Sequence, residues 1–146
     1  MLHIYNNLSL LSNIRHIACR RHMSSLYTKS HEYIHKADDN TAKIGISKYA
    51  VEQLGDIVFV EIPEVDTTIE KGEIACNVES VKAAGDIYSP LTGTIIEVNE
   101  KLDGEPDLIN LSPESDGWIF NIKFTNPEEL DNLMDKNAYE EYCKKN

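Results

Sequence analysis

The chain has 146 residues, 41% hydrophobic and 27% charged, which is the size and composition of one ordinary folded domain and excludes a disordered, collagen-like or membrane-bundle chain. The formal charge of −11 is uneven, because residues 1–30 carry +4 and residues 31–146 carry −15. The strong negative charge of residues 31–146 excludes nucleic acid as a partner, since phosphate binding needs Lys and Arg.

The first 25 residues have the composition of a mitochondrial presequence. They contain three arginines and no acidic residue, and Ile4, Leu8 and Leu11 recur at helical spacing. A plastid transit peptide overlaps in composition, and an unstructured tail is the plainer alternative. No apolar run approaches the roughly 20 residues that a membrane span needs, so no membrane partner is expected. We expect a targeting segment at 1–25, a folded domain at 26–146 and a location in the mitochondrial matrix.

The body begins with two predicted strands within residues 26–46, joined by a turn at 38–40, where Asp-Asp-Asn favours chain reversal. A short helix is predicted at 47–54, with Ser47 as its N-cap and Gly55 just beyond its end. Residues 57–60 are all apolar and predict a buried strand, which Pro63 ends.

Two further strands are predicted from alternating patterns. Cys76 and Val78 continue the face of Ile74, and Val98 continues that of Ile96. Residues 117–124 predict another strand. Asn126 and Pro127 have the residue types of an N-cap and a first helical position, and two short amphipathic helices are predicted after them. The pattern indicates a mainly β fold, a compact sandwich or flattened barrel with small α additions.

The three cysteines match neither a zinc-finger nor a disulfide pattern. Cys19 lies in the predicted presequence, and 67 residues separate Cys76 from Cys143 with no C-x-x-C and no later histidine. Both body cysteines are predicted to be small buried hydrophobic residues in a reducing compartment.

Residues 31–35 spell H-E-x-x-H, the zinc-binding pattern in which two histidines one helical turn apart chelate the ion. Here the segment is predicted as a strand, which would separate His31 and His35 by about 13 Å at roughly 3.3 Å per residue. That separation does not permit chelation, and no metal site is predicted. A zinc hydrolase built on His31, Glu32 and His35 is therefore the minority hypothesis.

Lys82 lies between two predicted strands, within the sequence Glu79-Ser80-Val81-Lys82-Ala83. Considered alone, a lysine between strands is most often a solvated turn residue, and the absence of Asn-Gly leaves even the turn unspecified.

The motif around Lys82 has a wider context, because the sequence from Tyr27 onward resembles the H proteins of the glycine cleavage system. The matching segments share short motifs of that family and lie at 30–32, 44–46, 54–61, 79–83, 86–90, 109–110, 112–113, 117–118 and 126–130. Lipoyl domains of 2-oxoacid dehydrogenases usually carry Asp before the lysine, and biotin carriers usually flank it with Met. Three positions depart from the family pattern: Tyr33 replaces the usual Trp, Glu114 a common Tyr, and Gly85 a usual Ser or other small residue.

The resemblance implies a hybrid barrel-sandwich fold with lipoate amide-linked to Lys82 at a hairpin tip. It implies a non-catalytic carrier that takes the aminomethyl group of glycine from the P protein, a pyridoxal-phosphate decarboxylase. The carrier delivers that group to the T protein, an aminomethyltransferase, and its reduced arm to the L protein, dihydrolipoamide dehydrogenase.

The resemblance also implies roles for other residues. Ser30, Glu32 and Asp86 fall at the positions of a cleft that shelters the loaded arm. Glu79 and Gly72 are candidates for recognition by the lipoate-attaching enzyme, and Ser80, Val81 and Ala83 complete the attachment motif. Alternatives are a lipoate donor to other complexes, a dehydrogenase subunit, or a β-rich interaction module without a prosthetic group.

Overall fold

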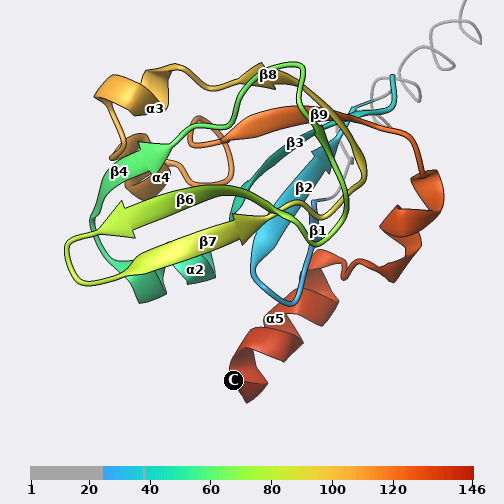
Figure 1. Cartoon of the computed structure of the whole chain (residues 1–146). Coiled ribbons are helices and arrows are strands. Elements are labelled where there is room, and N and C mark those ends of the chain that lie inside the picture. The colour runs from blue at the N-terminus through green and yellow to red at the C-terminus, as the bar shows by residue number, and fades with distance from the viewer. Residues whose placement is uncertain (1–24, 38) are drawn as a thin grey trace, which may run out of the picture.

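The computed structural model describes residues 25–37 and 39–146. The predicted presequence lies outside this range except for its last residue, and so does Asp38 of the predicted turn. Figure 1 shows two antiparallel sheets in separate layers, with small helices around them.

The larger sheet has six strands and the smaller has three. The six-stranded sheet runs in the order β1 (Leu26–Tyr27), β2 (Glu32–Lys36), β3 (Thr41–Ile46), β9 (Phe120–Phe124), β8 (Gly93–Val98) and β5 (Thr68–Ile69). The three-stranded sheet runs in the order β4 (Ile57–Glu61), β6 (Ile74–Ser80) and β7 (Ala84–Tyr88). The mainly β prediction is thus confirmed, as is the strand–turn–strand reading of residues 26–46.

Several short helices connect or flank the strands. They are α2 (Lys48–Leu54), α3 (Lys101–Gly104), α4 (Leu108–Leu111), the 3-10 helix η1 (Pro127–Asn132) and α5 (Lys136–Lys145). The cap of α2 is confirmed, because Ser47 Oγ accepts the Ala50 amide at 3.2 Å. Asn126 makes no such side-chain bond, and the helix after it is 3-10. Among the described helices, none is long and apolar enough to cross a bilayer.

The core lies between the two sheets. Ile44 and Ile122 contribute from the six-stranded sheet, and Val78 and Ile87 from the three-stranded one, all at most 1% exposed. The sheets therefore bury one shared hydrophobic layer, the arrangement that stabilises antiparallel sandwiches.

Irregular pairing makes three of the predicted strand faces wrong. In β6 the pairing with β7 shifts between Ile74 and Cys76, so Ile74 is exposed whereas Cys76 and Val78 are buried. The prediction that residues 57–60 form a wholly buried strand is wrong for Val58 and Phe59, which are exposed because the pairing of β4 with β6 shifts between Ile57 and Phe59. In β8 a shift between Ile95 and Glu97 buries Ile95 and exposes Ile96, the reverse of the predicted face. An extra residue in one strand changes which side chains face the core, and no alternating pattern reveals it.

A second, aromatic cluster joins the C-terminal helix to the sheet. The rings of Tyr27 and Tyr139 are stacked with centroids 4.3 Å apart, and Tyr33 belongs to the same cluster. Tyr33 also covers Gly45 on β3, where a Cβ would lie 2.7 Å from the ring. Tyr33 thus fills this position by close packing, although its hydroxyl is buried without a hydrogen-bond partner.

Candidate functional site

Lys82 lies at the tip of the β6–β7 hairpin, at the free end of the three-stranded sheet (Figure 1). Ser80 closes the turn: its amide donates to the Ala83 carbonyl at 2.7 Å, and its hydroxyl accepts the Ala83 amide at 3.0 Å. A serine hydroxyl can substitute for the turn chemistry of Asn-Gly. The Lys82 side chain is exposed and forms no ion pair within the described residues.

The loop of residues 55–57, which follows α2 and ends on the first residue of β4, supports the hairpin tip. The Val81 amide donates to the Asp56 carbonyl at 3.0 Å, which links the tip to the loop. Gly55 has φ of +83°, and a Cβ there would lie 3.3 Å from Lys82 Cε. Glycine at this position therefore satisfies the left-handed backbone and leaves room for the lysine stem.

Asn110, on α4, holds the same loop from its other side. Its side-chain oxygen accepts the Ile57 amide at 2.8 Å, and its side-chain nitrogen donates to the Gly55 carbonyl at 2.9 Å. The sequence placed Asn110 in a family motif but indicated no role for it. No local signal could have done so, because 53 residues separate Asn110 from Ile57.

The structure gathers most of the predicted attachment motif around the lysine, but one residue lies elsewhere. Glu79, Ser80, Val81 and Ala83 flank Lys82 at the end of the hairpin. Gly72 precedes the opposite end of β6, which at about 3.3 Å per residue is more than about 20 Å of strand away. Gly72 is thus not brought together with Lys82, and its role stays a prediction.

A cleft of about 320 Å³ lies between the start of β2, helix α2 and strand β7. Leu54 and Gly85 line it, and Leu54 directly precedes Gly55, which lies beside the lysine stem. The cleft therefore reaches the residue that precedes Gly55, while Lys82 itself is not among its lining residues.

The three predicted cleft residues all line this cavity, but Glu32 is already bonded within the protein. Its side chain is 1% exposed, and its carboxylate accepts hydrogen bonds from the Thr28 hydroxyl, the Ser30 hydroxyl at 2.6 Å and the Tyr88 amide at 3.1 Å. Glu32 thereby joins the start of β2 to the end of β7 and fixes the cleft wall.

Asp86 differs from Glu32 in its surroundings. It lies on β7 opposite Asn77, its side chain is exposed, and within the described residues its carboxylate has no hydrogen-bond or ion-pair partner. Of the two acids that line the cleft, Asp86 is therefore the one whose charge is available to a cationic ligand.

His31 connects the cleft to the C-terminal helix. Its Nδ1 lies 2.7 Å from the Tyr139 hydroxyl, which is 2.6 Å from Ser47 Oγ. Because Ser47 Oγ accepts the Ala50 amide, we assign its proton to Tyr139 and the Tyr139 proton to neutral His31. Through this network α5 fixes the position of Ser47 and of His31, which lines one wall of the cleft. Sequence reasoning missed this link, because the residues lie far apart in the chain.

Burial sets the protonation of these groups. It lowers the pKa of His31, against the opposing effect of the nearby Glu32 charge. Burial likewise lowers the pKa of His35 and raises that of the Tyr139 hydroxyl. A neutral His31 that accepts a hydrogen bond is consistent with these shifts.

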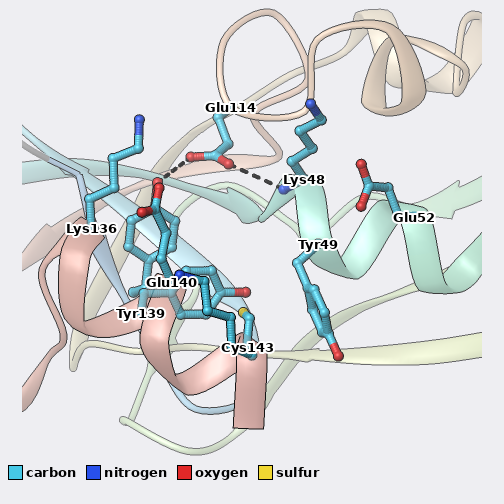
Figure 2. A pocket seen from close by; sticks show the side chains of 10 residues that line it. Lys48, Tyr49, Glu52, Glu114, Lys136, Tyr139, Glu140 and Cys143 are labelled. Atoms are coloured by element: carbon cyan, nitrogen blue, oxygen red, sulfur yellow. Dashed lines mark hydrogen bonds between the residues drawn. The ribbon is translucent and has the colours of Figure 1, made fainter. Parts of the chain in front are cut away.

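A second hollow, of about 640 Å³, lies between α2 and α5 (Figure 2). Glu114 bridges its rim, accepting the Tyr27 hydroxyl at 2.5 Å and the Lys48 amide at 3.1 Å. This departure from the family's Tyr therefore has a structural role at the start of α2. Both lysines and glutamates line the hollow, so its charges do not favour one kind of ligand.

The H-E-x-x-H segment forms a strand, as predicted: β2 contains Glu32 to Lys36, with His31 just before it. The helix that chelation by this motif requires is not formed. Across the described part of the chain, no three or more His, Cys, Asp or Glu side chains are grouped to hold a metal ion. Cys76 is buried as predicted, and burial raises the pKa of its thiol to about 12, whereas Cys143 is half-buried.

Comparison with known proteins adds three findings. The family model described as glycine cleavage H-protein matches residues 25–146. The chain is 51% identical over 117 residues to the glycine cleavage system H protein of Thermotoga maritima, covering 80% of this chain and 94% of that protein. It is 53% identical over 113 residues to the protein of the same name from Vibrio vulnificus, covering 77% of this chain and 90% of that protein.

A solved structure shares the fold. The crystal structure of a glycine cleavage system H protein from Mycobacterium marinum matches with a TM-score of 0.74 and 34% sequence identity. The match covers 84% of this chain and 96% of that one.

The first prediction concerns Asn110. Asn110→Ala leaves the Ile57 amide and the Gly55 carbonyl without their partner, which should cost about 1–3 kcal/mol of folding free energy, measured by urea unfolding. Hydrogen exchange at the Ile57 and Val81 amides should accelerate. Asn99→Ala is the matched control, because the Asn99 side chain also makes two hydrogen bonds to the backbone, in its case to the carbonyls of Asp116 and Trp118. Equal acceleration at Val81 in both variants would contradict the proposed support of the tip.

The second prediction concerns the pH dependence of stability. Because the folded pKa of His31 is lowered, the unfolded chain binds more protons as the pH falls below about 6.5, and stability decreases. His31→Gln should remove this contribution, at most about 1.4 kcal/mol per pH unit. Urea unfolding of both proteins between pH 7.5 and 5.5 measures the difference, and parallel profiles would show that His31 does not contribute.

Proposed function

Because the chain belongs to the glycine cleavage H-protein family, we propose that Lys82 is the residue to which its lipoyl group is attached. Members of this family are non-catalytic carriers with lipoate covalently bound to a lysine. The chain is therefore a lipoyl carrier of the glycine cleavage system and not itself an enzyme. The observation that supports Lys82 is its exposed position at the end of a two-stranded hairpin.

The residues around Lys82 fit such a group. The amine is exposed, the stem lies against a glycine, and the tip is held by the Ser80 turn and the Asp56 carbonyl. A modification at this position starts from an exposed amine, and the cleft lies three to four residues further along the chain, at Gly85 and Asp86. When bound, lipoate supplies thiol–disulfide chemistry and the sulfur that carries the aminomethyl group.

The cleft supplies the second part of the proposal. Leu54, Val78 and Ile87 give it apolar walls that exclude water, and Asp86 offers a carboxylate to a protonated amine. Glu32, bonded to Thr28, Ser30 and the β7 backbone, holds those walls in place. We therefore propose that Asp86 contacts the aminomethyl group and that Glu32 is a positioning residue.

We further propose that the carrier serves the P, T and L proteins of the system and resides in the mitochondrial matrix. The partners follow from the family, whose members act within a glycine cleavage system. The location rests on the acid-free, arginine-containing composition of residues 1–25.

The third prediction tests Lys82 and the N-terminus together. Intact and peptide mass spectrometry of protein from its native source should find a lipoyl adduct on Lys82 in a chain lacking roughly its first 20 residues. Lys82→Arg should abolish the adduct and glycine exchange, whereas Lys71→Arg, in another exposed turn, should abolish neither. An unmodified Lys82 in cells that lipoylate other proteins would refute the attachment site, and an intact N-terminus would refute import.

The fourth prediction separates the two cleft acids. Asp86→Asn should leave stability unchanged but raise the rate of aminomethyl loss from the loaded carrier about fivefold, the effect of losing roughly 1 kcal/mol of charge attraction. Asp103→Asn, an exposed acid on α3, is the control. Glu32→Gln should instead lower stability by about 1–3 kcal/mol, because the amide donates where three donors converge. The loss rate is measured by ammonia release, and an unchanged rate in Asp86→Asn would contradict its role.

A further inference from the structure

Four exposed apolar side chains surround the loop that supports Lys82. The described residues include eight large hydrophobic side chains that are exposed, and four of them lie at this end of the molecule. Here they are called the tip patch: Val58 and Phe59 on β4, Val81 beside the lysine and Leu111 on α4, exposed by 54%, 50%, 75% and 74%. Scattered single hydrophobic residues are ordinary, but such a cluster marks an interaction surface.

Hydrogen bonds hold the members of the tip patch together although they come from three distant segments. The Val81 amide is bonded to Asp56, two residues before Val58, and Phe59 pairs with Glu79 on β6. Leu111 adjoins Asn110, whose side chain is bonded to Gly55 and Ile57. The bulge in β4 turns both Val58 and Phe59 outward, so the strand presents two adjacent apolar side chains to solvent.

Apart from Lys82 itself, the charged side chains on the strands that adjoin the tip patch are all acidic. Strands β4, β6 and β7 contain three acids, Glu61, Glu79 and Asp86, and no Lys, Arg or His. Asp56, within the supporting loop, is also exposed. A complementary partner therefore has an apolar centre with lysine or arginine at its rim.

We propose that the tip patch is the docking surface for the enzyme that attaches lipoate to Lys82, an inference that rests on the proposed function. Attachment takes place at the lysine Nζ itself, so the active site of that enzyme must enclose the lysine, and its rim must contact the residues beside it. Enzymes that use the finished arm act at its far end, several bonds from Nζ. The residues next to Lys82 thus fit the attaching enzyme better than the arm-using enzymes.

The reaction defines what this docking must achieve. The Lys82 amine attacks the carbonyl carbon of an activated lipoyl ester or anhydride and forms an amide bond. The activating group leaves with the electrons of the broken acyl bond, and the amine gives up a proton to a base or to water. The tip patch contributes contact area that brings the amine to that carbon, and so it acts on binding more than on the chemical step.

The experiment measures lipoylation of the full-length unmodified protein by a purified lipoate–protein ligase, followed by mass spectrometry. The double variant Phe59→Ser/Leu111→Ser removes the largest members of the tip patch. The control is Ile74→Ser/Ile96→Ser, since both residues are exposed apolar side chains outside the patch. We expect KM for the carrier to rise about tenfold in the patch variant with kcat within about twofold, and the control to stay within about twofold. Thermal unfolding verifies that both variants are folded.

Three results would overturn the inference. The first is an unchanged KM in the patch variant, and the second is an equal rise of KM in the control variant. The third is normal lipoylation of the patch variant with impaired use of its finished arm, because that result would assign the patch to another partner. A wild-type protein that the ligase does not modify at Lys82 would instead refute the proposed function, so the two failures are distinguishable.

The same lipoylation assay also tests whether the partner has a basic rim that complements the acids around the tip patch. Asp56→Asn/Glu79→Gln should raise KM several-fold at low salt and weaken its dependence on ionic strength, because rim charges act through screened attraction. Glu128→Gln/Asp131→Asn, two exposed acids of η1, is the matched control. An unaltered salt dependence in the tip variant would contradict a basic rim on the partner.

Discussion

The position of Lys82 depends on a short set of hydrogen bonds around the loop of residues 55–57. Asn110 holds that loop through both atoms of its amide, and the loop in turn accepts the Val81 amide at the hairpin tip. An isolated two-stranded hairpin is marginally stable, so its end needs such support if it is to present one lysine in a constant place. The same loop carries the glycine against which the lysine stem lies. Attachment site, supporting loop and cleft therefore form one continuous unit.

The two acids that line the cleft have different roles, one structural and one chemical. Glu32 is buried and accepts three hydrogen bonds, and replacing such a group leaves donors unsatisfied in the interior. Asp86 is exposed and has no partner in the described structure, so its charge remains available. Two carboxylates that look equivalent as sequence motifs thus differ in burial and bonding. The opposite wall is held by α5, through Tyr139, His31 and Ser47, which explains why a helix at the end of the chain matters to a site formed near its beginning.

The exposure of Val58 and Phe59 near Lys82 is a consequence of the bulge in β4. A regular β4 would alternate its side chains and bury every second one, whereas the bulge exposes Val58 and Phe59 together. An exposed apolar surface lowers solubility unless a partner covers it, and the strong net negative charge of the chain offsets that effect. A carrier that must meet several enzymes benefits from both features, because charge favours encounter and apolar contact prolongs it.

The sequence by itself determined the mainly β class and the capped helix at Ser47, and the resemblance of the Glu79–Ala83 motif to that of a known family indicated the candidate lysine. These properties depend on neighbouring residues, so local periodicity and short motifs are sufficient to predict them. The tertiary structure alone decided which strands contain bulges, which cleft acid is bonded, and that Asn110 supports the lysine. Each of those outcomes depends on residues far apart in the chain, whose hydrogen bonds and packing exist only once the two sheets and the C-terminal helix have come together.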